Sequence, residues 1–328
     1  MNVFVTGANG LLGTALVRKL AKKHKVTAFV LKGTPLKDLN SIKNVTIKQG
    51  NILDQKSIEE ALGNCIAVYH LAAAVHVPDV MKKKLYMLNV KGTENVLNAC
   101  IKSKKVKRLI YASTIAIYGK VKDDKRTVID ESHPIVPASN YGKTKLIGER
   151  IVKGLCPKHN IRFIIIRPSK IYGPGDSSLL PLLKLARIGM SFTIGKGDGM
   201  TMPAYVDDIA EAFYLALESK KTDTEYIVTG PDVVTKRQFV AMLAKTVGKR
   251  PRKIRIPSLP IMILAHVGEK GAAVFNHHLK LTQKLEFFLS SRRYSIEKAR
   301  KELKYSPSVT VEQMVAKTAE WYRQERML

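Results

Sequence analysis

The chain has 328 residues, 45% of them hydrophobic, which excludes a disordered protein and is enough for one large or two interlocked globular domains. Its 56 Lys and Arg against 27 Asp and Glu give a formal net charge of +29, a field that attracts anionic partners. Because the basic residues are spread along the whole chain, we interpret most of this charge as a solvated surface. Contact with an anionic or membrane surface is the alternative.

Several classes of protein are not expected from this sequence. The cysteines Cys65, Cys100 and Cys156 are far apart and form no metal-ligand pattern, so we expect reduced core thiols and no metal. Nucleic-acid binding is not expected either, because there is no zinc motif, clear recognition helix or aromatic-basic pattern. The N-terminus lacks a leader pattern and no apolar run approaches a membrane span, so we expect a cytoplasmic protein.

In the first half of the chain, short apolar or β-branched runs alternate with longer amphipathic stretches. The expected strands are residues 3–6, 26–30, 45–48, 67–71, 108–112 and 162–166, and the clearest helices are residues 11–23, 92–102 and 141–153. Repeated units of this kind predict an α/β fold, a doubly wound parallel (Rossmann) sheet with helices on both faces. The last three runs are almost continuously apolar, which is typical of central strands.

The second half of the chain breaks this rhythm after Arg167-Pro168 and becomes rich in turns. A helix over residues 207–218 and a strand over residues 225–229 are expected to return to the sheet. We therefore predict two interleaved domains. The first comprises residues 1–168 plus about 204–230, and the smaller substrate domain comprises about 169–203 plus 231–328.

A glycine-rich segment directly follows the first expected strand and opens the first helix. Glycines at these positions allow a tight turn, and the backbone N–H groups at the helix start favour a pyrophosphate. The segment predicts a dinucleotide site with the contacts Gly7, Asn9, Gly10, Leu11, Leu12 and Gly13.

The end of the second strand bears on the choice of cofactor. An acidic residue there would bind the ribose hydroxyls of NAD, but this sequence has Lys32, which suits the 2′-phosphate of NADP. NADP is therefore preferred to NAD, with a solvated lysine as the alternative. After the third strand, Asn51 and Ile52 are expected beside the adenine, while Asp54 could equally cap a helix.

Three tyrosines precede a lysine by four residues, the spacing that places two side chains on one face of a helix. They are Tyr118/Lys122, Tyr141/Lys145 and Tyr294/Lys298. Spacing alone does not choose among them in a chain so rich in lysine.

Seven motifs occur in a fixed order along nearly the whole chain. They are Thr6-Gly7-x-x-Gly10-x-x-Gly13, His70-Leu71-Ala72-Ala73, Asn89-Val90-x-Gly92-Thr93, Ser113-Thr114-x-x-x-Tyr118-Gly119, Tyr141-x-x-x-Lys145, Arg167-Pro168-x-x-x-Tyr172-Gly173-Pro174 and Val206-Asp207-Asp208. Together they resemble the extended short-chain dehydrogenase/reductases, a family that includes nucleotide-sugar epimerases and dehydratases, dihydroflavonol reductases and 3β-hydroxysteroid dehydrogenases.

The resemblance selects Tyr141 and Lys145 as the catalytic pair and implies structural roles for Tyr118 and Tyr294. It makes Tyr141 the general acid and base, with its pKa lowered by Lys145 and the oxidised nicotinamide. It further implies the substrate-orienting hydroxyls Thr114 and Ser113, and a position near the active site for Asn89, for which a helix N-cap is the alternative. The implied cofactor contacts also include Leu71, Ala72, Ala73, Lys145, Pro168 and Ile171.

Two histidine positions are assigned no catalytic role. We expect His70 to be packed and hydrogen-bonded, and the pair His277-His278 to lie on the surface.

The sequence around these motifs favours one reaction over others. Ile115 and Ala116 follow Thr114, so the acids required for sugar dehydration are missing. Met200 and Met202 lie in the segment where nucleotide-sugar enzymes commonly have a diphosphate-binding arginine. They suit an apolar substrate wall, with packing in the core as the alternative, and residues 256–267 read as an apolar lid. We predict an NAD(P)-dependent oxidoreductase acting on an apolar secondary alcohol or ketone. The alternatives are a UDP-sugar 4-epimerase and a non-catalytic dinucleotide-binding regulator.

The resemblance also implies a homodimer. The pairing would use the helices expected over residues 92–102 and 141–153.

Overall fold

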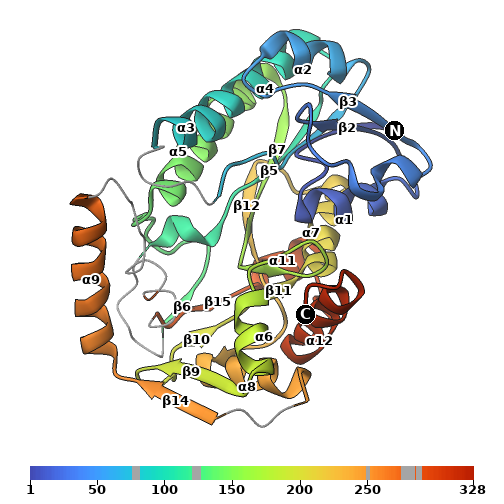
Figure 1. Cartoon of the computed structure of the whole chain (residues 1–328). Coiled ribbons are helices and arrows are strands. Elements are labelled where there is room, and N and C mark those ends of the chain that lie inside the picture. The colour runs from blue at the N-terminus through green and yellow to red at the C-terminus, as the bar shows by residue number, and fades with distance from the viewer. Residues whose placement is uncertain (76–81, 120–126, 249–251, 275–284, 286–289) are drawn as a thin grey trace.

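The larger part of the molecule is built on one parallel sheet (Figure 1). The computed structural model describes residues 1–75, 82–119, 127–248, 252–274, 285 and 290–328. The seven strands of the sheet run in the order β12-β7-β5-β4-β1-β2-β3, with every neighbouring pair parallel. Their bounds are β1 Asn2–Thr6, β2 Lys25–Val30, β3 Val45–Gln49, β4 Ala67–His70, β5 Arg108–Ala112, β7 Arg162–Pro168 and β12 Thr224–Val228. The order reverses between β1 and β4, which confirms the predicted doubly wound sheet.

Helices cover both faces of this sheet because successive strand residues point to opposite sides. Val3 and Val5 share a core with α1 (Leu11–Leu20) and α7 (Val206–Glu218), whereas Phe4 packs in the core of the other face. The second face is covered by α2 (Gln55–Leu62), α4 (Gly92–Ser103) and α5 (Asn140–Leu155). The runs expected to form central strands are indeed β4, β5 and β7, in the middle of the sheet.

The strand register aligns the carboxyl ends of the strands along one edge. Thr6 of β1 lies opposite His70 of β4, which in turn lies opposite Tyr111 of β5. The loops that leave this edge therefore start close together, and parallel sheets bind ligands at this edge where the strand order reverses.

A smaller region of short strand pairs and helices lies below the sheet in the view of Figure 1. Its strand pairs are β8 (Ile171–Tyr172) with β11 (Ala204–Tyr205), β9 (Met190–Ile194) with β14 (Arg252–Ile256), β10 (Met200–Thr201) with β13 (Val234–Thr235), and β6 (Val128–Ile129) with β15 (Arg293–Tyr294). Its helices are α6 (Leu180–Arg187), α8 (Lys236–Thr246), α9 (Ser258–Val274), α11 (Glu297–Leu303) and α12 (Val311–Gln324). Between these segments the chain returns to the large sheet through α7 and β12, as expected.

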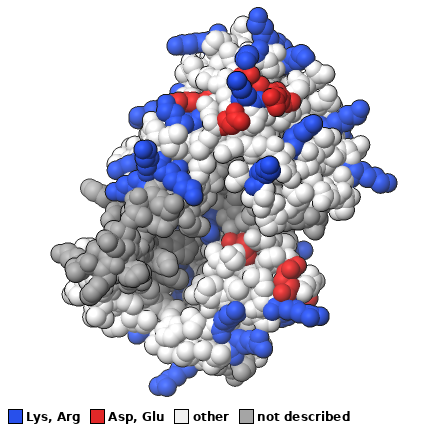
Figure 2. All heavy atoms as spheres, turned by 45° about the horizontal axis from the view of Figure 1, so that its top comes forward, with Lys and Arg blue, Asp and Glu red and all other residues white. Residues whose placement is uncertain are grey.

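On the face that Figure 2 shows, lysines and arginines occur on both lobes, most of them apart from one another, with one group gathered at the left of the view. In the described ranges, no helix combines the length and the apolar character that crossing a membrane requires. The three cysteines are buried and unpaired with one another, as expected.

Two glycines in helices provide a matched stability test. An added Cβ at Gly13 in α1 would lie 2.1 Å from the carbonyl oxygen of Gly7, whereas a Cβ at Gly154 in α5 would meet no atom within 4 Å. We expect Gly13→Ala to lower the free energy of unfolding by about 1–3 kcal/mol through overpacking. Gly154→Ala should raise it by up to about 1 kcal/mol through helix propensity. Urea unfolding measures both, and equal effects would contradict the close approach at Gly13.

Candidate active site and cofactor groove

The glycine-rich turn between β1 and α1 lies directly against the loop that follows β4. Gly7 has φ +66°, and a Cβ there would lie 2.8 Å from the backbone nitrogen of Ala72. Gly10 is the N-cap residue of α1, with Leu11 and Leu12 opening the helix. Backbone N–H groups at this helix start, with no side chain in front of them, fit the pyrophosphate of a dinucleotide. The turn and the segment Leu71–Ala73 thus form one wall of a candidate cofactor groove.

Side chains around the loop after β2 arrange the adenosine end of this groove. The amide of Asn9 donates to the Thr34 hydroxyl at 2.9 Å and to the Pro35 carbonyl at 3.0 Å. Both amide hydrogens of Asn9 therefore fix this loop, so its contribution to a cofactor site is to position the loop. Lys32 lies just beyond the end of β2 and is exposed, which leaves its ammonium free to meet an anion.

The turn after β3 is organised by its own polar side chains. Asn51 Oδ1 accepts from the backbone N–H of Leu53 at 2.9 Å. The Asp54 carboxylate accepts from Lys56 N at 3.0 Å and caps α2, which confirms that reading of Asp54. Ile52 packs over Gly92 of α4, where a Cβ would lie 2.7 Å from its side chain. The turn is thereby held beside α4, the helix that directly follows Asn89.

His70 is a buried, neutral member of a hydrogen-bond chain, as expected. Burial, followed by the charge of Lys145, lowers its pKa to about 3. Thr93 donates its hydroxyl proton to the Asn89 carbonyl at 2.8 Å, so it must accept from His70 Nε2 at 3.0 Å. Nδ1 of His70 then accepts from Thr6, whose oxygen accepts from Ala72 N. The chain of bonds fixes the tautomer and anchors the cofactor-side loop.

Asn89 lies inside a continuous helical run and not at a helix start, so the N-cap alternative is wrong. It belongs to the π-helical turn Met87–Lys91 between α3 (Lys82–Tyr86) and α4. Its side chain accepts from Ala74 N at 2.8 Å and donates to Ala74 O at 3.0 Å and to Thr144 Oγ1 at 3.1 Å. Asn89 therefore joins the loop after β4 to α5, next to Lys145, and π turns often mark functional sites.

Tyr141, Lys145 and Thr114 meet at the carboxyl edge of the sheet. Ser139 caps α5 by accepting from Gly142 N at 3.0 Å, which sets Tyr141 in the first turn and Lys145 one turn later on the same face. Thr114 follows β5 in an extended conformation and is hydrogen-bonded to Tyr141. The Lys145 ammonium lies 4.1 Å from the centre of the Tyr111 ring. The predicted pair and its hydroxyl partner are thus brought together.

The electrostatics of this pair differ from the expectation. Desolvation raises the pKa of Tyr141 to about 12, although the hydrogen bond with Thr114 opposes the shift, so Lys145 alone does not bring this pKa below its ordinary value. The lowering expected from Lys145 together with the oxidised nicotinamide stays a prediction. Burial likewise lowers the pKa of Lys145 to about 7, against the opposing charge of Glu149. Lys145 is therefore only partly charged at neutral pH. Burial affects the pKa of Tyr141 more than the charge of Lys145 does.

Sequence reasoning missed a buried ion pair beneath the catalytic pair. Glu149 follows Lys145 by four residues on α5 and is 2% exposed, and Arg167 at the end of β7 is fully buried. Arg167 donates through Nε and a terminal nitrogen to the two Glu149 oxygens, at 3.0 and 2.7 Å. Ser113 also donates to Glu149, so its hydroxyl is oriented toward this pair and away from a substrate role. The spacing Tyr141-x3-Lys145-x3-Glu149 places the three side chains on one face of α5. This spacing was the signal in the sequence that could have identified Glu149.

The two other tyrosine–lysine pairs are placed as follows. The Tyr118 hydroxyl accepts from Arg167 at 2.8 Å, whereas Lys122 lies outside the described residues, as do His277 and His278. Lys298 donates to the Thr224 hydroxyl and lies over the Tyr226 ring, contacts that fit a structural role.

The remaining predicted cofactor and substrate residues lie in the segments from β7 to β8 and from β10 to β11. Pro168 ends β7 and Ile171 opens β8, past the carboxyl edge. Met200 is half-buried, but Met202 is in the core and its sulfur accepts from Tyr294 N, so it does not form a substrate wall. Among the described residues, no cluster of three His, Cys, Asp or Glu is arranged to hold a metal ion.

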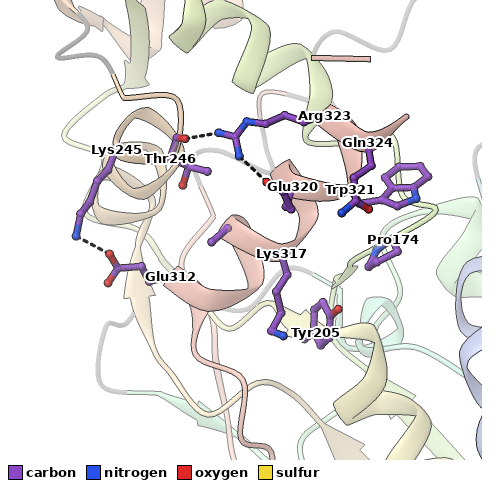
Figure 3. A pocket seen from close by; sticks show the side chains of 11 residues that line it. Pro174, Tyr205, Lys245, Thr246, Glu312, Lys317, Glu320, Trp321, Arg323 and Gln324 are labelled. Atoms are coloured by element: carbon purple, nitrogen blue, oxygen red, sulfur yellow. Dashed lines mark hydrogen bonds and ion pairs between the residues drawn. The ribbon is translucent and has the colours of Figure 1, made fainter. Parts of the chain in front are cut away.

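A groove of about 680 Å³ lies elsewhere, along α12 (Figure 3). Lys317 reaches over the Tyr205 ring, 5.8 Å from its centre, and the ion pair Lys245–Glu312 closes one end. The groove is lined by Pro174, Tyr205, Lys245, Thr246, Glu312, Ala316, Lys317, Glu320, Trp321, Arg323 and Gln324. None of the catalytic candidates lines it, so we do not assign the reaction to this groove.

The buried ion pair between Glu149 and Arg167 leads to a prediction about stability. Glu149→Met should lower the free energy of unfolding by up to about 3–5 kcal/mol, because it leaves the buried Arg167 guanidinium with only the partly exposed Glu225 carboxylate, 3.6 Å away. The double variant Glu149→Met/Arg167→Met should recover much of that loss. Glu312→Met, which breaks the exposed pair with Lys245, should leave unfolding nearly unchanged. Chemical denaturation of the set tests this, and additive losses in the double variant would contradict it.

Comparisons with known proteins agree with this arrangement. The model of the NAD dependent epimerase/dehydratase family matches residues 3–229. The 2-alkyl-3-oxoalkanoate reductase of Shewanella oneidensis is 28% identical over 95% of this chain and 84% of its own length. The sterol-4-alpha-carboxylate 3-dehydrogenase of Saccharomyces cerevisiae is 29% identical over 98% of this chain and 97% of its own.

A third relative is longer than this chain. The 3beta-hydroxysteroid-dehydrogenase/decarboxylase isoform 2 of Arabidopsis thaliana is 28% identical over 96% of this chain, which spans 60% of that protein. Among solved structures, the UDP-glucuronic acid 4-epimerase of Bacillus cereus in complex with NAD has a TM-score of 0.80 at 23% identity, covering 99% of both chains. That likeness shows the fold. The chain belongs to the NAD dependent epimerase/dehydratase family and is, as its ordered motifs indicated, an enzyme of the extended short-chain dehydrogenase/reductase type.

Proposed function

We propose that this chain reduces a ketone, or oxidises the corresponding secondary alcohol, with Tyr141 as the proton donor and acceptor. The observation that carries the proposal is the meeting of Tyr141, Thr114 and Lys145 at the carboxyl edge of the sheet, near the glycine-rich turn. The nicotinamide cofactor, when bound, supplies or accepts the hydride. Tyr141 gives its hydroxyl proton to the ketone oxygen as the carbonyl carbon gains the hydride, and the Thr114 hydroxyl orients that oxygen.

The raised pKa of Tyr141 determines which form of the phenol is present at neutral pH. With a pKa of about 12 the phenol keeps its proton at neutral pH, as a donor to a ketone must. In the oxidative direction the same phenol would first have to lose that proton, at a cost that positive charge nearby reduces. Lys145 supplies this charge only in part, because burial lowers its pKa to about 7.

We propose that the substrate has an apolar body and an oxygen function next to a carbon that bears a carboxylate. The names of two relatives support this class. One reduces a 2-alkyl-3-oxoalkanoate, and the other oxidises position 3 of a sterol 4-carboxylate. In both compounds the reacting carbon lies β to the carboxylate carbon. The alternative is a UDP-sugar 4-epimerase, which the name of the matching family keeps open.

The catalytic assignment predicts a separation of turnover from binding. Tyr141→Phe should lower kcat by about 10²–10⁴-fold, because the proton donor is lost, while cofactor affinity stays unchanged. Lys145→Met should weaken both. Tyr294→Phe, which changes the same residue type at the rejected position, should keep wild-type turnover. Steady-state kinetics and cofactor fluorescence titration measure these effects, and wild-type turnover in Tyr141→Phe would refute the assignment.

We also propose a preference for NADP over NAD, carried by the exposed ammonium of Lys32 beyond β2. A charge-assisted contact to a phosphate is worth roughly 1.5–3 kcal/mol, so Lys32→Glu should weaken NADPH binding by about 10–100-fold. NADH binding should change little. Lys158→Glu, an exposed lysine on the turn Pro157–His159, is the matched control. Equal NADPH affinity in wild type and Lys32→Glu would show that Lys32 does not bind the 2′-phosphate and would contradict this basis for the preference.

We further propose a homodimer that pairs α4 and α5 across a two-fold axis, in the cytoplasm. Lys102 at the end of α4 is paired with Glu59 of α2 at 2.6 Å, which reduces its unfavourable charge at such an interface. Buried thiols without disulfides fit a reducing compartment.

A further inference from the structure

Helix α9 turns its large apolar side chains toward solvent. Leu259, Ile263, Leu264 and Val267 are 71%, 56%, 70% and 63% exposed. Their spacing of four, one and three residues places them on one face of the helix. A surface helix of a globular protein normally shows the reverse arrangement, with its apolar face inward. These four residues are called the α9 stripe.

The side of α9 that faces the protein carries a mixture of apolar, small and polar groups. Ala265 is 5% exposed, and Ser258, Ile261, Met262 and Glu269 are half-buried. Glu269 is the only acidic residue of the helix sequence, so the outward face bears no carboxylate. Within the part of the chain that the structure describes, no other helix or strand packs broadly against α9. The helix stands at the outer edge of the molecule in Figure 1.

A basic strand leads directly into this helix. Strand β14 pairs only with β9 among the described strands, and Pro257 alone separates it from α9. Arg252 and Arg255 of β14 are both exposed. An apolar face next to exposed arginines matches the interface of a lipid bilayer, where apolar side chains enter the acyl boundary and cations meet anionic headgroups.

We propose that the α9 stripe is a docking surface for an anionic lipid membrane, on which the helix lies without crossing it. The helix has 17 residues, a length of about 25 Å, and no described helix meets the requirements of a membrane span. A second copy of this chain is a less favourable occupant, because a two-fold pairing of the stripe would bring the exposed Arg252 and Arg255 of both copies to the same interface. The proposal does not depend on the reaction, since it concerns a surface outside the catalytic residues.

Vesicle binding of the full chain tests the proposal without substrate or cofactor. The probes are vesicles of phosphatidylcholine alone and of phosphatidylcholine with phosphatidylglycerol. Wild type should bind the anionic vesicles, and Leu259→Ser/Ile263→Ser/Leu264→Ser should bind them about tenfold or more weakly, because membrane affinity scales with the apolar area inserted. Arg252→Glu should weaken binding to anionic vesicles only. The matched control Val136→Ser/Ile188→Ser removes side chains that are 63% and 66% exposed elsewhere, and should bind as wild type does.

Three results would overturn the proposal. The first is no binding of wild type to the anionic vesicles, and the second is equal binding of wild type and the triple variant. Sedimentation could instead show that wild type self-associates through α9 and that the triple variant does not, which would identify a second copy as the occupant. Thermal unfolding and circular dichroism of the triple variant check that the loss of binding is not a loss of fold.

Discussion

The buried ion pair between Glu149 and Arg167 is the interaction on which the catalytic geometry depends. It joins α5 to the end of β7, and through Ser113 and Tyr118 it also holds the two ends of the loop after β5. Two buried charges gain stability only when their hydrogen bonds are well matched, and here each oxygen of the carboxylate has a donor. The helix that carries Glu149 also carries Lys145 and Tyr141, one and two turns earlier, so the ion pair with Arg167 sets where they lie relative to the sheet.

Proton control in this site results from burial more than from nearby charge. The pKa of Tyr141 is raised to about 12 and that of Lys145 is lowered to about 7, because desolvation disfavours the charged form of both groups. The charge of the Glu149 carboxylate opposes the lowering of the Lys145 pKa. The site thus holds a protonated phenol beside a lysine that can change charge near neutral pH, a combination suited to giving a proton to a ketone.

Much of the fold followed from local pattern, whereas parts of the site did not. The glycine turn and the apolar strands depend on backbone geometry and on alternation, which a sequence displays directly. The order of motifs, and not spacing, distinguished Tyr141 from Tyr294. The partners of Asn89 and Glu149 come from segments 15 to 55 residues away, so their hydrogen bonds could not be read from neighbouring residues. The shift of the Tyr141 pKa likewise depends on tertiary burial.

The most direct test of the central claim is the fate of the cofactor's hydride. The purified chain would be incubated with a freshly prepared 2-alkyl-3-oxoalkanoate and NADPH or NADH deuterated at the transferring position of the nicotinamide, and the product analysed by mass spectrometry. The account predicts an alcohol with one deuterium on the carbinol carbon and one cofactor oxidised per product. No reduction of any apolar ketone, together with epimerisation of a UDP-sugar without net cofactor oxidation, would contradict it.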